Sequence, residues 1–187
     1  EIMRDLELPR FGLQVIAYEG GAVFSQDGDY LANYRDHDAH RREFARFSRR
    51  DAEAYDRYAR DVTRQCRFIQ PLLMRTAPDP TSFKPRDVGE LIYLGKKFAG
   101  LSAEEMALTL RFWTMSISDF LDEYFETDVI KANFALSGII GTALGPMSPG
   151  TSYVLLHHYM GEVAGSVCAW GSARGGMVAV THALSSY

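Results

Sequence analysis

The residues best suited to chemistry lie near the carboxyl end of the chain and include the adjacent pair His157 and His158. Neighbouring residues of a helix point about 100° apart, so these two cannot form the i, i+4 histidine pair of helical metal sites. Glu162 follows His158 at i+4, but no second aligned histidine completes such a site. We therefore predict no metal here, and each histidine either lines a cavity or is a hydrogen-bonded structural residue.

A glycine-rich run from Trp170 to Met177 follows, with glycines at positions 171, 175 and 176. Glycine permits positive φ and close backbone approach, and the helix expected after the run has free N–H groups at its amino terminus. The run is therefore either one wall of a ligand pocket or a plain turn before a helix. The residues that we expect to face such a pocket are Tyr153, His157, His158, Trp170, Gly175, Gly176 and Met177.

Several catalytic and nucleotide-binding motifs are absent from the sequence. It contains neither GxGxxG nor GxxxxGK[ST], the turns that bring phosphate groups to a helix amino terminus, and it has no GxSxG nucleophile motif. Cys66 and Cys168 are far apart and form no CxxC pair, so we expect reduced thiols, with Cys168 buried and inert. The chain thus lacks a recognisable cradle for nucleotide phosphates.

The composition is that of an ordinary globular domain. The 187 residues are 47% hydrophobic and 24% charged, and a net charge of -4 argues against a general nucleic-acid-binding protein. No apolar run reaches the roughly 18–20 residues that a transmembrane helix needs. We expect a single domain over residues 1–187 of a cytoplasmic protein. Because the chain begins at Glu1 and ends just past a helical pattern at Tyr187, we also expect it to be an internal piece of a longer protein.

The sequence pattern predicts that these residues are positioned by an α+β fold. It has a small antiparallel β-meander over residues 1–36 and a mainly helical part over residues 37–187. The meander is expected to have three strands, at 14–18, 22–25 and 30–34, with Gly20-Gly21 and Asp27-Gly28 as turns.

The first long helix is expected to begin after Ser48, which can cap it. Its apolar residues recur at three- and four-residue steps and form one stripe made of Tyr55, Tyr58, Val62, Cys66 and Ile69. Arginines occupy other angles of the same helix, at positions 57, 60, 64 and 67. They form either a solvated or domain-facing basic side, or a site for an anion or a membrane headgroup.

Shorter helices follow a proline-rich connection at residues 78–86. We expect one from Val88 to Phe98, one opened by a Ser102-Glu105 capping box, and others beginning at Ser118 or Asp119, at Thr127 or Asp128, and at Ser148 with Pro149 in its first turn; the last is expected to extend towards Gly161 or Gly165. Glycines 138, 141 and 145 mark either close packing and turns or a flexible lid.

The runs PGTSYVLLHHYMG at 149–161 and AWGSARGGM at 169–177 resemble the phytoene-desaturase-like branch of FAD-dependent oxidoreductases, and a weaker resemblance covers most of the chain. The resemblance implies the substrate-binding or cap portion of a flavoprotein that oxidises an apolar small molecule by hydride transfer to flavin. It also implies that residues 1–36 belong to a substrate-side sheet, and that residues 170–177 border the cavity where substrate meets the flavin ring.

Two hypotheses follow for the chain itself. In the first, FAD belongs to the parent protein and is held by an FAD-binding domain outside these residues, so the isolated chain is inactive and does not bind FAD tightly. The surface that the FAD-binding domain would cover is then exposed in the isolated chain, and we expect the chain to form a homodimer through it. In the second, the chain is a non-catalytic helical interaction module that self-associates or docks on a partner.

Overall fold

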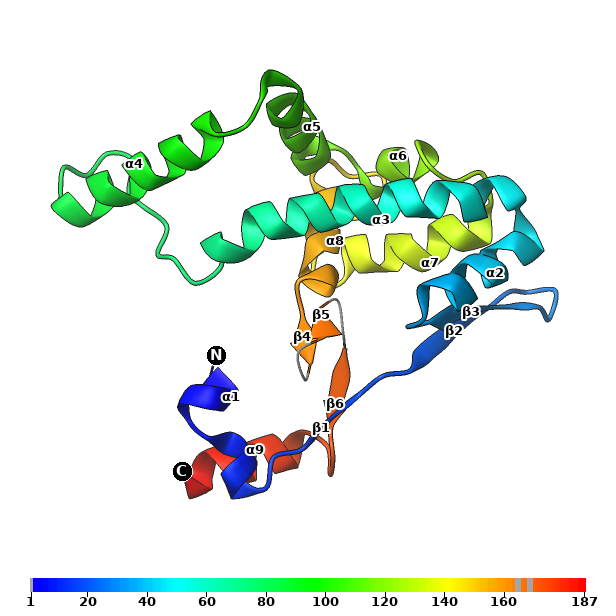
Figure 1. Ribbon diagram of the computed structural model, residues 1–187, viewed down its shortest axis with the longest axis horizontal. Coiled ribbons are helices and arrows are strands. Elements are labelled where there is room, and N and C mark those ends of the chain that lie inside the picture. The colour runs from blue at the N-terminus through cyan, green and yellow to red at the C-terminus, as the bar shows by residue number, and fades with distance from the viewer. Residues whose placement is uncertain (1, 164–165, 168–169) are drawn as a thin grey trace.

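The longest helix, α3 (Arg49–Ile69), forms the axis of the helical part of the molecule (Figure 1). Ser48 caps it by accepting a hydrogen bond from the backbone N–H of Asp51 at 3.1 Å, which confirms the predicted start. The predicted apolar stripe is confirmed as well, since Tyr58, Val62, Cys66 and Ile69 are buried. The computed structural model describes residues 2–163, 166–167 and 170–187, and the expectation for Cys168 falls outside them.

Other helices pack around α3 and enclose an aromatic core. They are α2 (His37–Phe47), α5 (Ala103–Thr114), α6 (Ile117–Asp122), α7 (Asp128–Ile139) and α8 (Thr151–Tyr159). Tyr58 is fully buried at the centre, with its ring centroid 4.7 Å from that of Phe134 and 5.2 Å from that of Phe125. Its hydroxyl lies 2.9 Å from the hydroxyl of Tyr159, and this hydrogen bond links α3 to α8.

Helix α8 begins at Thr151, two residues later than a cap at Ser148 with Pro149 as the first helical residue predicts. Gly150 precedes it with a φ of 84°, a left-handed conformation that separates the preceding turn from the helix. The Ser152 hydroxyl donates to two carbonyl oxygens at the end of α5, at 2.6 and 2.8 Å, and this fixes the first turn of α8. The helix ends at Tyr159 with Met160 as its C-cap, directly before Gly161, so the nearer of the two predicted ends agrees and the helix does not extend towards Gly165.

The other helix starts agree more closely with the sequence. The capping box of Ser102 and Glu105 opens α5, and Thr127 directly precedes α7. Helix α6 starts slightly earlier than predicted because Ser116, rather than Ser118, accepts the capping hydrogen bond.

The glycines at the end of α7 act in packing and turning. A Cβ atom at Gly138 would lie 2.7 Å from the side chain of Ile117, so α7 can approach α6 this closely only with glycine there. Gly141 has a φ of 73°, which turns the chain after the helix. These observations favour close packing and turns over a lid.

The β part consists of short antiparallel pairs, which confirms the α+β class. Strands β2 (Gly20–Phe24) and β3 (Tyr30–Tyr34) form the predicted hairpin, with Val23 opposite Leu31. Strands β4 (Glu162–Val163) and β5 (Ser166–Val167) pair with each other. The predicted sequence of helix, glycine turn and helix after residue 147 is therefore interrupted by strands.

The predicted three-stranded meander is wrong, because the first strand has a distant partner. Strand β1 (Val15–Ala17) pairs with β6 (Gly171–Ala173) and not with β2. Gly20 was expected to turn the chain between β1 and β2, but it lies within β2. A Cβ atom there would be 2.0 Å from the carbonyl oxygen of Asn33, so glycine allows close strand approach at this position.

The β1–β6 pair joins the helical part to a small terminal part (Figure 1). The terminal part contains α1 (Ile2–Asp5), the 3₁₀ helix η1 (Leu8–Phe11) and α9 (Met177–Ser186), around an apolar cluster of Leu8, Leu13 and Ala183. The rings of Phe11 and Tyr187 are 5.9 Å apart, so the two ends of the chain lie together. The description of residues 1–187 as a single domain stays a prediction.

Helix α4 (Pro85–Ala99) extends away from the other helices as an arm (Figure 1). The predicted proline-rich connection leads into it, with Pro85 in its first turn. At its base, the ring of Phe98 packs 5.2 Å from Phe68 and 5.8 Å from Trp113. In the part of the chain that the structure describes, no helix combines the length and apolar character needed to cross a bilayer.

Asp51 fixes the loop between α6 and α7 against the first turn of α3. Its carboxylate is fully buried and accepts the backbone N–H groups of Glu126 at 2.9 Å and Thr127 at 3.0 Å. Both hydrogen bonds involve a charged acceptor, so each contributes more than a neutral one.

We predict that Asp51→Ala lowers the free energy of unfolding by about 3 kcal/mol, because it removes the charged acceptor of two backbone hydrogen bonds. Urea denaturation followed by circular dichroism measures this loss. Glu53→Ala is the control, since Glu53 is exposed on the same helix. Equal effects of the two substitutions would contradict the role assigned to Asp51.

Candidate functional site

A cavity of about 360 Å³ lies between the β2–β3 hairpin and helices α2, α3, α7 and α8, and we call it the hairpin cavity. Its size is at the lower end of the range for ligand pockets, which is roughly 300–1,000 Å³. Six aromatic side chains line it: Tyr18, Tyr34, Tyr55, Phe134, Tyr159 and Trp170. The walls therefore suit a small ligand with apolar or planar parts.

His40 of α2 lines the hairpin cavity and is 5% exposed. Its Nδ1 lies 3.1 Å from the backbone nitrogen of Tyr34 and 3.2 Å from the carbonyl oxygen of the same residue, which fixes the ring. Its Nε2 is buried and has no hydrogen-bond partner among the described residues. Burial lowers the pKa of His40 below its ordinary value, so the imidazole is neutral at pH 7.

His158 of α8 lines the same cavity. Its ring centroid lies 4.5 Å from that of Trp170, and the indole Nε1–H of Trp170 donates to the carbonyl oxygen of His158 at 2.8 Å. The Nδ1 atom of His158 is buried and has no partner within the described ranges. Burial, and then the neighbouring His157, lower the pKa of this imidazole as well.

The polar wall of the cavity includes an amide pair. The Nδ2 atoms of Asn33 and Asn133 each donate to the other's Oδ1 at 2.9 Å, and this ties β3 to α7. Each amide group keeps one N–H and part of its oxygen for a further contact. The cavity thus combines apolar walls with amide and imidazole groups that can donate or accept hydrogen bonds.

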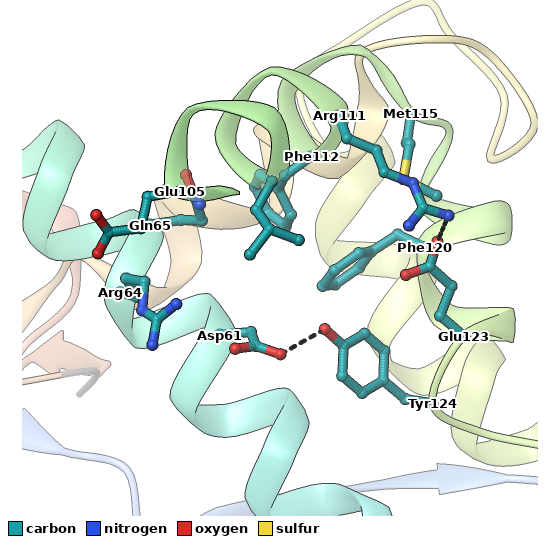
Figure 2. A pocket seen from close by; sticks show the side chains of 11 residues that line it. Asp61, Arg64, Gln65, Glu105, Arg111, Phe112, Met115, Phe120, Glu123 and Tyr124 are labelled. Carbon is teal, nitrogen blue, oxygen red and sulfur yellow. Dashed lines mark hydrogen bonds and ion pairs between the residues drawn. The ribbon is translucent and has the colours of Figure 1, made fainter. Parts of the chain in front are cut away.

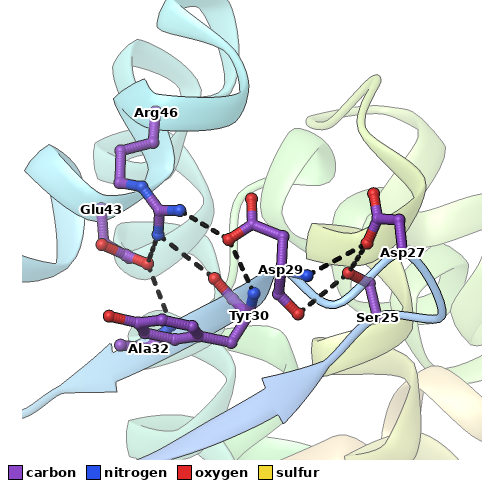
Figure 3. Close-up of polar contacts among 7 residues, drawn as sticks. All are labelled: Ser25, Asp27, Asp29, Tyr30, Ala32, Glu43 and Arg46. Carbon is purple, nitrogen blue, oxygen red and sulfur yellow. Dashed lines mark hydrogen bonds and ion pairs between the residues drawn. The ribbon is translucent and has the colours of Figure 1, made fainter.

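The hairpin wall is held in place by Arg46 of α2 (Figure 3). Arg46 donates to Asp29 at 2.8 Å and to the carbonyl oxygen of Tyr30 at 3.2 Å, and it forms an ion pair with Glu43. Glu43 in turn accepts the backbone N–H of Ala32 at 3.1 Å. The backbone N–H of Tyr30, together with Arg46, lowers the pKa of Asp29, so this anchor is charged at neutral pH.

The structure brings only part of the predicted pocket together. His158 and Trp170 line the hairpin cavity, whereas His157 is exposed and its Nδ1 lies 3.1 Å from the carbonyl oxygen of Val154. Tyr153 packs against Trp113, with a centroid distance of 5.8 Å.

The glycines that we expected to face the pocket lie outside the hairpin cavity. Gly175 and Gly176 have φ values of 88° and 75°, as expected of a glycine turn, and with Met177 they form the start of α9 in the terminal part. None of the three is a lining residue of the hairpin cavity.

Sequence reasoning missed His40, Tyr55 and the two asparagines. One sequence feature points to His40, since it stands four residues before the buried Phe44 and so shares the apolar face of α2. Asn33 and Asn133 are 100 positions apart, and no local pattern connects them. Within the described residues, no group of three or more His, Cys, Asp or Glu side chains is arranged to hold a metal ion.

A second, much smaller niche of about 50 Å³ lies between α3, α5 and α6 (Figure 2). Its polar side chains largely satisfy each other: Tyr124 donates to Asp61 at 2.8 Å, and Arg111 pairs with Glu123. Burial raises the pKa of Tyr124, so its hydroxyl keeps its proton. The niche has room for little more than water, and we assign it a structural role.

Comparison with known proteins finds relatives along the whole chain. The chain is 36% identical to the mouse (Mus musculus) protein named pyridine nucleotide-disulfide oxidoreductase domain-containing protein 2, and 32% identical to the rat (Rattus norvegicus) protein of the same name. It spans about a third (34%) of the length of each. No family model and no solved structure matches it. The chain is therefore similar over its whole length to proteins named for an oxidoreductase domain, and the phytoene-desaturase-like assignment stays a prediction.

We predict that stability falls as the pH is lowered from about 7.5 to 5.5. The unfolded chain binds protons at histidine near pH 6.5, whereas folded His40 and His158 bind them only at lower pH, so acid favours unfolding in this window. His40→Asn, whose amide can keep the contact to Tyr34, should make the dependence shallower. Urea denaturation at several pH values measures the free energy of unfolding and so its dependence on pH.

His182→Asn is the control, because His182 is exposed on α9. It should leave the pH dependence as in the unchanged chain. If both variants show the same pH dependence of unfolding, His40 is not the residue responsible.

Proposed function

We propose that this chain is the substrate-binding portion of a larger flavin-dependent oxidoreductase, and that the hairpin cavity takes an apolar substrate. The observation that carries this proposal is that two buried imidazole nitrogens without partners belong to residues lining one aromatic cavity. Unpaired buried polar atoms are rare, and a ligand supplies the missing contacts. The relatives, about three times as long, carry an oxidoreductase name that supports the reaction class.

FAD does not fit the chain on its own. The cavity is at the small end for a single ligand, and the sequence lacks a glycine-rich cradle for dinucleotide phosphates. We therefore assign FAD to a domain outside these residues, where a bound flavin would accept the hydride.

The chain's own residues bind and orient the substrate. The aromatic walls contact its apolar parts and exclude water, and Trp170 is held at one end by its hydrogen bond to the His158 backbone. The neutral imidazoles of His40 and His158 donate or accept a hydrogen bond at the polar end of the substrate.

A second candidate function is an interaction module, and one observation favours it. The terminal part exposes several large apolar side chains, among them Met177, which is 77% exposed, and Tyr187, which is 66% exposed. Exposed apolar surface of this kind favours contact with another protein surface. In the leading proposal the FAD-binding domain covers it; in the isolated chain a second copy does.

We predict that the isolated 187-residue chain forms a homodimer through this surface. Light scattering over a range of concentrations measures the mass, and Met177→Glu should shift the equilibrium towards the monomer because it places a charge in the contact. Phe83→Glu is the control, since Phe83 is even more exposed, at 95%, but lies in the loop before α4. A monomer at every concentration would contradict the prediction.

The function itself is tested in the parent protein, purified with its flavin. We predict that His158→Gln lowers kcat/KM at least about tenfold, because it removes the imidazole that hydrogen-bonds the polar end of the substrate in this proposal. The adjacent His157→Gln, outside the cavity, should leave kcat/KM unchanged. Anaerobic flavin reduction by a panel of apolar alkenes and amines measures the rate.

Flavin retention supplies the matching control. The parent should keep flavin absorbance through gel filtration, whereas the 187-residue chain should not. Stoichiometric flavin on the isolated chain would contradict the assignment of FAD to another domain, and equal effects of the two histidine substitutions would contradict the assignment of the hairpin cavity.

A further inference from the structure

A wide groove of about 730 Å³ lies along helices α2 and α3, and we call it the arginine groove. Its lining residues are His37, Arg41, Asp56, Ala59, Arg60, Thr63, Arg64 and Arg67. It shares none of them with the hairpin cavity. The lining carries four guanidinium groups and one carboxylate in a protein whose net charge is -4, so the positive charge is concentrated here.

The single carboxylate of the groove belongs to Asp56, and it contacts two residues of α2. Asp56 lies 2.8 Å from Nε2 of His37 and 3.6 Å from a guanidinium nitrogen of Arg41. The hydrogen bond from His37, and then Arg41, lower the pKa of Asp56, so the carboxylate is charged. The negative charge of Asp56 therefore offsets the charge of Arg41 more directly than the charges of the arginines farther along α3.

The other three arginines make no hydrogen bond or ion pair with any residue that the structure describes. Arg60, Arg64 and Arg67 are all exposed. The two acids that line the neighbouring niche with Arg64 make hydrogen bonds to other groups, since Asp61 accepts from Tyr124 and Glu105 closes the capping box of α5 (Figure 2). Hydrogen bonds from Ser102, and then the charge of Arg64, lower the pKa of Glu105, so this acid offsets part of the charge of Arg64.

The spacing of these arginines places them on one face of α3. Positions i, i+4 and i+7 follow one side of a helix, and seven residues rise by about 10 Å. Like charges at these spacings repel each other, which disfavours the groove without a counter-anion. A ligand with several negative groups along its length relieves that repulsion at more than one point.

We propose that the arginine groove binds a small ligand that carries two or more linked phosphate groups. Guanidinium groups contact phosphate oxygens through paired hydrogen bonds, and a row of three matches a short row of phosphates better than a single carboxylate. A long polyanion is disfavoured, since the charged row is short and the rest of the protein is acidic. This site is independent of the oxidoreductase proposal.

The test is calorimetric titration of inorganic pyrophosphate into the 187-residue chain, at constant ionic strength. We expect saturable binding, weakened at least about tenfold in the double variant Arg60→Gln/Arg64→Gln. The matched control is Arg42→Gln/Arg49→Gln, which removes the same charge from exposed positions on the same two helices, outside the groove. It should bind pyrophosphate as the unchanged chain does.

The substituted side chains are exposed, and circular dichroism checks that each variant is folded. Absence of pyrophosphate binding, or equal weakening in both double variants, would overturn the proposal. Sulfate binding as tightly as pyrophosphate at equal ionic strength would overturn the requirement for linked phosphates. Binding to vesicles with anionic headgroups, without binding to pyrophosphate, would also overturn it and assign the groove to a membrane surface.

Discussion

Burial of one tyrosine ring organises the helical part of this protein. Tyr58 contacts rings from α6, α7 and α8 and from the loop after α6, so the packing of α3 fixes where each of these helices lies. Burial raises the pKa of its hydroxyl, which therefore stays neutral and can share a hydrogen bond with Tyr159. Tyr159 also lines the hairpin cavity, so the core and the candidate site have a common wall.

The features that the sequence predicts well are those that depend on neighbouring residues. Ser48 caps α3 and Ser102 pairs with Glu105 because both contacts lie within one helical turn. The apolar stripe around Tyr58 follows in the same way from a repeat of three and four residues. Local hydrogen bonds and periodicity thus determine most of the helical part.

The features that the sequence does not predict depend on contacts between distant segments. The partner of β1 is β6, and no periodicity distinguishes this pairing from a pairing with β2. The same limit applies to the candidate site: the family resemblance and glycine pattern pointed to His158 and Trp170, but His40 joins them only through the packing of α2 and the hairpin. Gly150 likewise shifts the start of α8 through a backbone conformation that composition alone does not specify.

The pairing of β1 with β6 makes the whole helical part an insertion between two adjacent strands. The hydroxyls of Tyr18 and Ser172, 154 positions apart, lie 2.7 Å from each other. Contacts at such a separation close a large loop and form late in folding. During synthesis α1 and η1 leave the ribosome first. Their apolar cluster is complete only when α9 has been synthesised, because Ala183 belongs to that helix. The helical part can assemble in that interval.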